Sequence, residues 1–97
     1  MNYQIIYEET VIREDFPRLG ESVRQRIIKE VGKKLSVAPN QFGRPLGDVL
    51  KGYRRLRVGD YRVIYRVDDD NTSVLVVMVI HRRTKYKGVK ERISKYD

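Results

Sequence analysis

The apolar positions in the N-terminal part of the chain follow two different periods. Residues 2–7 (NYQIIY) are rich in β-branched and aromatic side chains, which predicts a first strand. Further on, apolar side chains recur every three or four positions, the spacing that places them on one face of an α-helix. These side chains are Phe16, Leu19, Val23, Ile27, Val31 and Leu35. The stripe predicts a long helix that packs on a core, and we assign it no chemistry.

A shorter helix is expected before this stripe, over residues 11–19. Thr10 is placed to cap its N-terminus, and Ser22 to cap the helix that follows. Pro17 falls inside the short helix and is expected to kink or break it, because proline has no backbone N–H. Residues 10–36 are therefore predicted to form a helical hairpin.

The second half of the chain predicts three strands in quick succession. Residues 37–52 carry two prolines and three glycines and are expected to form a loop. Residues 53–58 and 61–67 flank a Gly-Asp pair that indicates a tight hairpin, and residues 73–80 follow an acidic turn. The last run is apolar without interruption, which indicates a strand near the sheet centre that is covered on both faces.

Together these elements predict an α+β fold over a single domain, residues 1–97. The expected order is an N-terminal strand, a helical hairpin, a three-stranded antiparallel meander that completes a small sheet, and a short C-terminal helix over 87–96. We expect a mainly antiparallel sheet with the helices packed on one face. A chain of 97 residues has room for one core of modest stability.

The predicted hairpin separates apolar side chains from arginines. If residues 59–60 are the turn, Arg57 faces Arg62 and side chains alternate between the two faces of the sheet. The apolar face carries Leu56, Val58, Tyr61, Val63 and Tyr65, with Arg54 at its margin. The basic face carries Tyr53, Arg55, Arg57, Arg62, Ile64 and Arg66. Like charges directly opposite one another are destabilising, which favours an anionic partner such as phosphate. The alternative is a solvated face screened by salt or by acids elsewhere.

The distribution of charge along the chain also favours an anionic partner. Basic residues outnumber acidic ones by 21 to 13, and the formal net charge is +8. Residues 51–66 hold six bases and one acid, and residues 81–90 hold five Lys or Arg and no acid. A one-sided positive field attracts nucleic acid, although charge alone is equally compatible with an ordinary solvated surface.

The residue types that are scarce exclude several kinds of site. The chain has no cysteine and one histidine, which excludes disulfides, thiolate chemistry and Cys- or His-rich metal sites. The acidic run 68–70 is expected to be a solvated turn, so we predict neither a metal nor a cofactor. Residues 1–7 lack the pattern of a signal peptide, and the longest apolar run, residues 74–80, is too short to span a membrane. We therefore expect a cytoplasmic protein without a membrane partner.

Polar residues follow the central apolar run directly. His81, Arg82 and Arg83 come first, and Tyr86 lies three residues later. If residues 73–80 run antiparallel to 61–67, His81 lies at the 59–60 end of the sheet, where the facing arginines also lie. Histidine exchanges a proton near neutral pH, and tyrosine can stack on a base or act on a proton. A lone histidine is more often structural than catalytic. The hypothesis that His81 acts in catalysis therefore depends on the arginines and the tyrosine that follow it.

Three stretches resemble the RelE/ParE superfamily of bacterial and archaeal toxins. They are FGRPLGDVLKG at 42–52, GYRRLRVGDYRVIYRV at 52–67 and VVMVIHRRTKY at 76–86. The resemblance implies an enzyme that enters the ribosomal A site and cleaves mRNA there. The 2′-hydroxyl of one nucleotide attacks the adjacent phosphate, which cuts the chain and leaves a 2′,3′-cyclic phosphate. Cleavage of the mRNA inhibits translation. It also implies a cognate antitoxin that covers the basic face, with operator DNA bound only through the antitoxin complex.

The resemblance also implies roles for particular residues. The catalytic residues that it indicates are Arg55, Arg57, Arg62, Arg82 and Tyr86. The basic side chains expected to contact RNA are those of Arg54, Arg66, Arg83, Lys85 and Lys87. The best-known members have lysine in place of Arg55 and Arg57, and arginine is a poor general base because it stays charged. Proton transfer is then left to Tyr86 or to His81, which has no counterpart in those members.

Two other functions fit the same pattern. ParE-type members share the fold but poison DNA gyrase without cutting RNA, and they lack the full set of basic residues with tyrosine. A module that binds nucleic acid without catalysis would have the same basic strands, with binding that depends strongly on salt. Translation arrest, gyrase trapped on DNA, or binding without product distinguishes the three.

Overall fold

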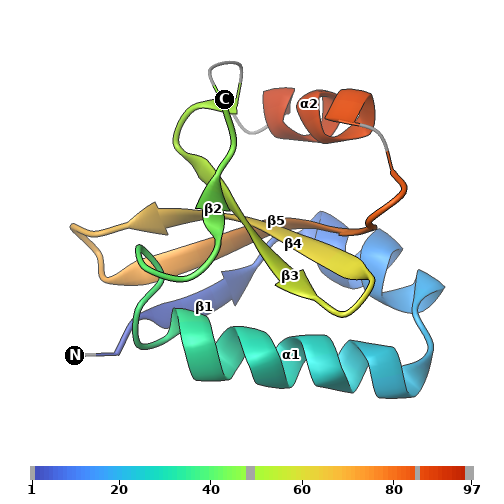
Figure 1. The fold of residues 1–97 in the computed structure, drawn as a ribbon, viewed down its shortest axis with the longest axis horizontal. Helices are drawn as coiled ribbons and strands as arrows, with labels where there is room; N and C mark the ends of the chain where they lie inside the picture. Colours follow the sequence, from blue (N-terminus) through green and yellow to red (C-terminus); the bar gives the residue numbers. More distant parts are fainter. Residues whose placement is uncertain (1, 48–49, 85, 96–97) are drawn as a thin grey trace.

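The computed structural model describes the chain apart from residues 1, 48–49, 85 and 96–97, and it leaves the side chains of residues 86 and 87 undescribed. Its strands form one sheet in the order β1-β5-β4-β3-β2. The strands are β1 (Gln4–Tyr7), β2 (Arg44–Pro45), β3 (Tyr53–Val58), β4 (Tyr61–Asp68) and β5 (Ser73–His81). The helical segments are η1 (Val11–Asp15), η2 (Phe16–Arg18), α1 (Glu21–Leu35) and α2 (Tyr86–Ser94). Figure 1 shows the sheet between α1 on one side and α2 on the other.

The predicted meander is confirmed. β3, β4 and β5 are antiparallel neighbours, and the hairpin has the expected register, with Arg57 opposite Arg62 and Val58 opposite Tyr61. β1, in contrast, pairs in parallel with β5, so the sheet is mixed. β2 lies within the predicted loop and pairs with β3 at the sheet edge. Pro45 is tolerated there because an edge strand can leave one N–H position unused.

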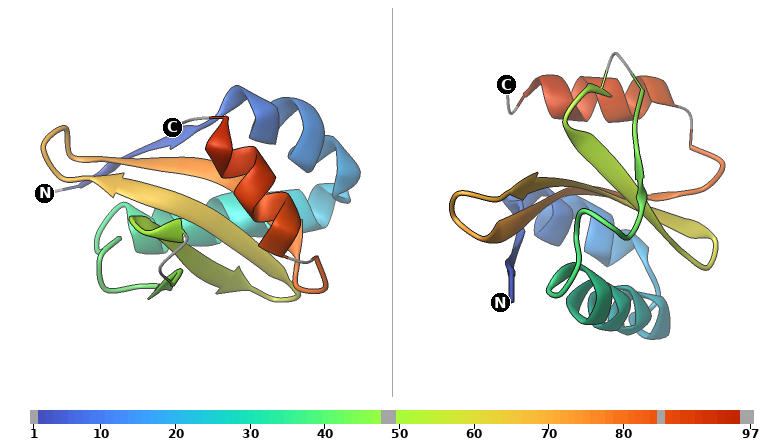
Figure 2. Two further views of the ribbon diagram at one scale, coloured as in Figure 1. Left: turned by 90° about the horizontal axis from the view of Figure 1, so that it is seen from above. Right: turned by 60° about the vertical axis from the view of Figure 1, so that its left-hand side comes forward.

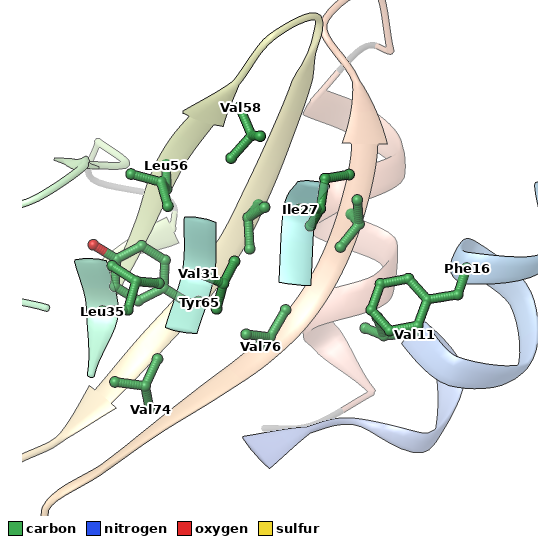
Figure 3. Packing of buried hydrophobic residues seen from close by; sticks show 12 residues of the cluster. Val11, Phe16, Ile27, Val31, Leu35, Leu56, Val58, Tyr65, Val74 and Val76 are labelled. Atoms are coloured by element: carbon green, nitrogen blue, oxygen red, sulfur yellow. The ribbon is translucent and has the colours of Figure 1, made fainter. Parts of the chain in front are cut away.

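The prediction that the helices share one face is wrong. Ile27, Val31 and Leu35 of α1 belong to one buried cluster with the apolar face of the β3–β4 hairpin (Figure 3). Val89 and Ile93 of α2 belong to a second cluster on the opposite face. Figure 2 shows α2 lying across that face. The reason is the apolar run of β5, whose side chains point to both faces and therefore need cover on both, as its uninterrupted pattern predicts.

The second cluster also changes the basic face. Tyr53 and Ile64, expected among its arginines, are buried with Leu46, Leu50 and α2. The arginine side chains of this face therefore surround a covered apolar centre. The face is not an open basic surface.

Thr10 is at the N-cap position of η1, as predicted, but the capping bond expected of it does not form, and Ser22 is not the cap of α1. Thr10 itself has helical backbone angles and makes no side-chain capping hydrogen bond, because the helical turn already includes residues 9–10. α1 begins at Glu21, and its extended N-cap is Gly20, two residues before Ser22. The expected break at Pro17 is confirmed, since the chain changes there from the π-helical η1 to the 3₁₀-helical η2.

A buried ion pair closes the open edge of β5. β1 ends opposite Val76, so the second half of β5 has no strand on that side. There the Val79 N–H donates to Asp15 Oδ2 at 2.9 Å, and Arg92 Nη1 donates to the Val77 carbonyl at 3.1 Å. Arg92 also binds both carboxylate oxygens of Asp15, at 2.9 and 3.0 Å. The pair satisfies backbone groups that lack a strand partner and ties η1 to α2.

Tyr7 has a buried hydroxyl with no hydrogen-bond partner among the described residues. Burial raises the pKa of Tyr7 to about 12. Because an unsatisfied buried polar group costs about 1–3 kcal/mol, Tyr7→Phe is expected to increase the free energy of unfolding by about 1 kcal/mol. A tyrosine whose folded pKa is raised contributes stability that is present below its unfolded pKa and lost as the pH rises through the folded one. The variant should therefore lose less stability than the wild type between about pH 10 and pH 12.

Urea unfolding at neutral and alkaline pH measures both effects of Tyr7→Phe. Tyr3→Phe is the matched control, since the Tyr3 hydroxyl is exposed and donates to Asp69 at 2.7 Å. It should lose a little stability where Tyr7→Phe gains. A loss for Tyr7→Phe would mean that its hydroxyl has a partner in solution.

Candidate nucleic-acid interface

Four arginines gather around the tip of the β3–β4 hairpin. Arg57 and Arg62 are direct cross-strand partners, and Arg55 lies one step further from the turn on the same face, opposite Ile64. Arg57 is exposed, while Arg55 and Arg62 are half-buried. Arg82 joins them from the end of β5. We call Arg55, Arg57, Arg62 and Arg82 the arginine cluster.

Asp60 attaches Arg82 to the hairpin turn. The Arg82 N–H donates to the Asp60 carbonyl at 2.7 Å, and the Arg82 Nε lies 3.5 Å from Asp60 Oδ1. Gly59, with φ +59°, provides the left-handed residue that the turn needs. The place of Asp60 in a two-residue turn does not predict this contact, because the contact joins two segments that are distant along the chain.

His81 lies at the predicted end of the sheet but faces away from the arginine pair. It is the cross-strand partner of Tyr61, and the two rings meet edge-on with centroids 5.3 Å apart. Tyr61 packs against the α1-side cluster, so His81 is on that side as well. The Arg83 N–H donates to His81 Nδ1 at 3.2 Å. His81 and the pair of Arg57 and Arg62 therefore cannot contact one phosphate from the same side of the sheet.

The residues expected to contact RNA are scattered. Arg54 is on the α1 side, and its Nη2 lies 3.3 Å from the carbonyl oxygens of Phe42 and Gly43. Arg66 is on the arginine-cluster face but far from the turn, with its guanidinium 5.7 Å from the Tyr53 ring centroid. Arg83 is exposed beside Arg82. Lys85 and the side chains of Tyr86 and Lys87 lie outside the described residues.

This arrangement suits an anionic ligand. Guanidinium groups offer paired donors that match phosphate oxygens, and the strands hold them in fixed positions. Within the part of the chain that the structure describes, no group of three or more His, Asp or Glu side chains is arranged to hold a metal ion. Among the same residues, no helix has the length and apolar character needed to cross a membrane. The chemistry available at the cluster is thus stabilisation of negative charge.

Comparison with known proteins adds the family. Residues 6–86 match the family described as ParE toxin of type II toxin-antitoxin system, parDE. Toxin RelG of Mycobacterium tuberculosis is 33% identical over 80% of this chain and 90% of its own length. Toxin RelE of the same organism is 32% identical over 88% of this chain and 87% of its own length.

A solved structure agrees with these sequence matches. The toxin–antitoxin complex RelBE2 of M. tuberculosis contains a chain that is 31% identical, with a TM-score of 0.79, covering 87% of this chain and 95% of that one. The family resemblance noted in the sequence is thus confirmed by sequence and by fold. The chain belongs to the RelE/ParE family of toxins of type II toxin–antitoxin systems.

Proposed function

We propose that this toxin is a ribosome-dependent endoribonuclease that cleaves mRNA in the A site. In this reaction the 2′-hydroxyl of one nucleotide loses its proton and attacks the adjacent phosphate. The bond from phosphorus to the 5′-oxygen of the next nucleotide breaks, that oxygen takes up a proton, and a 2′,3′-cyclic phosphate is left on the first nucleotide. Cleavage of the message halts translation. The observation that carries the proposal is the directly opposed pair of Arg57 and Arg62, with Arg82 attached to the same hairpin turn.

The electrostatics of the pair support an anionic substrate. Two guanidinium groups in direct cross-strand register repel one another, and a phosphate between them would turn this cost into binding. Attack by the 2′-hydroxyl builds negative charge on the phosphate oxygens. Donors that are already in place on rigid strands stabilise that charge without reorganising. The cluster is therefore suited to the transition state more than to any neutral ligand.

Proton transfer requires a group outside the arginine cluster, because arginine remains charged in proteins. His81 is on the opposite face of β5 from Arg57 and Arg62. We therefore propose Tyr86, the residue that the family resemblance indicates, for proton transfer. Arg55 and Arg57 then act on charge and not as bases.

A cognate antitoxin is the partner that we propose for the free toxin. The related RelBE2 toxin was solved in a toxin–antitoxin complex. An acidic segment of an antitoxin would complement the net charge of +8 and would block access of RNA to the arginine cluster. Operator DNA would be bound through that complex.

Gyrase poisoning is the second candidate, because the matching family is described by its ParE toxin. A translation reaction programmed with a defined mRNA separates the two candidates, with new 5′ ends mapped by primer extension. We expect cuts within ribosome-occupied codons and none without ribosomes. Intact mRNA and unimpaired translation would contradict the ribonuclease proposal, and a supercoiling assay with gyrase would then test the alternative.

We also expect cleavage to be independent of a toxin-bound metal. Protein treated with EDTA and then freed of the chelator should cleave at the untreated rate, provided that the ribosomes keep their own magnesium. The arginine cluster supplies positive charge that a metal would otherwise provide. Loss of activity that added metal restores would contradict this prediction.

A further inference from the structure

A pocket lies at the open edge of β5, beyond the end of β1. Its volume is about 270 Å³. Its lining includes Arg18, Leu19, Tyr61, Val79, His81 and Thr84. The Asp15 carboxylate, which is paired with Arg92, also borders it. We call it the edge pocket. It opens on the α1 side of the hairpin tip, and the proposed ribonuclease mechanism makes no use of it.

The backbone of β5 presents two polar groups at this edge. Val79 donates its N–H to Asp15, so its cross-strand pairing with Val63 carries no hydrogen bonds. Pairs alternate along an antiparallel ladder, and the pairing of His81 with Tyr61 is therefore of the same kind. The Val79 carbonyl and the His81 N–H consequently point away from β4, toward the pocket. An acceptor and a donor two residues apart are available to a planar polar ligand.

Aromatic and cationic side chains complete the pocket. His81 and Tyr61 form one wall, with their rings edge-on, and Leu19 adds an apolar surface. His81 Nδ1 accepts the Arg83 N–H, so in the neutral ring Nε2 carries the proton and is a donor. Arg18 is exposed at the pocket and provides positive charge. A flat ring with polar edges and an attached phosphate matches all of these groups.

Size and position favour RNA over a protein segment. A volume of 270 Å³ is at the lower end of small-ligand pockets and holds one ring system more readily than a helix. Tyr61 and His81 directly adjoin Arg62 and Arg82 along the chain. A strand of RNA that crosses the hairpin tip would therefore meet the arginine cluster first and the edge pocket next.

We propose that the edge pocket binds the base of a nucleotide adjacent to the cleaved phosphate. This inference rests on the proposed ribonuclease function and extends it, because it assigns base preference to Arg18, Tyr61, His81 and Thr84. The arginine cluster would act on the phosphate whatever the sequence, and the edge pocket would select the base beside it.

The single histidine of the chain makes the test direct, since His81 gives the one imidazole signal in an NMR spectrum. At constant neutral pH, we would titrate the full chain with AMP, GMP, CMP and UMP, and with ribose 5-phosphate as the control without a base. We expect the His81 signal to shift with at least one nucleotide, with a dissociation constant of about 1 mM, and not with ribose 5-phosphate. Thr84→Trp, which fills the pocket, should weaken this binding at least about 10-fold.

Val37→Trp is the matched control for added aromatic bulk, because Val37 is 62% exposed and does not line the pocket. It should bind nucleotides like the wild type. Arg18→Ala should also weaken nucleotide binding. Because it introduces a smaller side chain, it tests the pocket without the risk that a bulky residue disturbs the fold. No shift with any nucleotide, an equal shift with ribose 5-phosphate, or a shift with an acidic peptide alone would overturn the proposal.

The same measurements separate this inference from the proposed function. Cleavage of ribosome-bound mRNA without any nucleotide-induced shift would refute the edge pocket and leave the ribonuclease proposal standing. A nucleotide-induced shift without cleavage would refute the ribonuclease, and with it the place of the base beside a cleaved phosphate, while nucleotide binding by the edge pocket would stand. If both hold, Thr84→Trp should flatten the base preference of the mapped cuts while cleavage continues.

Discussion

Arg62→Ala is expected to lower the rate of mRNA cleavage by about 100- to 1000-fold, the usual effect of removing one preorganised donor to a developing negative charge. Arg62 is half-buried and directly opposite Arg57, so the strand holds its guanidinium group in place beside that of its partner. Primer extension on a translation reaction measures the loss. Arg62→Lys should recover part of the rate, because lysine keeps the charge but loses the paired donors.

Arg13→Ala is the matched control for the loss of one positive charge. Arg13 is exposed on η1, where it pairs with Glu9 at 3.0 Å, and it belongs neither to the arginine cluster nor to the lining of the edge pocket. It should cleave at the wild-type rate. Urea unfolding of Arg62→Ala checks that the variant is still folded, since the substitution leaves no cavity in the core. A variant that cleaves normally, or that is inactive because it unfolds, would contradict this role of Arg62.

Asp15→Asn is expected to cost about 3–5 kcal/mol of stability, because it leaves the charge of Arg92 without its counter-ion in a buried position. The side chains of Asp15 and Arg92 are 3% and 10% exposed. A domain of this size has about 5–15 kcal/mol in total, so the variant should be only marginally folded. Urea unfolding monitored by circular dichroism measures the change, and α2 should be the element that loosens first.

Glu9→Gln is the matched control, since it breaks the exposed pair with Arg13, whose side chains are 72% and 74% exposed. It should cost less than about 1 kcal/mol. Combining Asp15→Leu with Arg92→Met should recover part of the loss, because the unpaired charge disappears. The recovery should be incomplete, since the Val79 N–H and Val77 carbonyl still lack these partners. A cost for Asp15→Asn no greater than for Glu9→Gln would refute this stabilising role of the buried pair of Asp15 and Arg92.

Local pattern was sufficient for the elements whose partners are near in sequence. The Gly-Asp turn and the alternation of side chains correctly predicted the register of the β3–β4 hairpin, and with it the facing of Arg57 and Arg62. The helical stripe correctly predicted that Ile27, Val31 and Leu35 would be buried. These inferences succeed because a two-residue turn and a helical period leave a single choice of face.

The face of His81 shows what local pattern could not provide. Counting back from the pairing of Asp68 with Ser73 would place Ile80, not His81, opposite Tyr61. A bulge where the β4–β5 pairing passes Ile64 and Tyr65 adds one residue to β5 and pairs His81 with Tyr61. One residue of register moves a side chain to the other face of the sheet. The prediction that His81 lies at the hairpin end of the sheet was thus correct. The face of the sheet on which its side chain lies depended on the bulge, which the sequence pattern did not predict.

The sequence by itself determined the three antiparallel strands, the apolar stripe of α1 and the opposed arginines, because each depends on spacing within a short segment. It also carried the resemblance to the family, through the three stretches at 42–52, 52–67 and 76–86. The tertiary structure alone decided that β1 lies parallel to β5, that α2 covers the face opposite α1, and that Asp15 meets Arg92. It also brought Asp60 to Arg82 and formed the edge pocket. These contacts join segments far apart along the chain, and their free energy comes from burying two faces of β5 and satisfying its open edge.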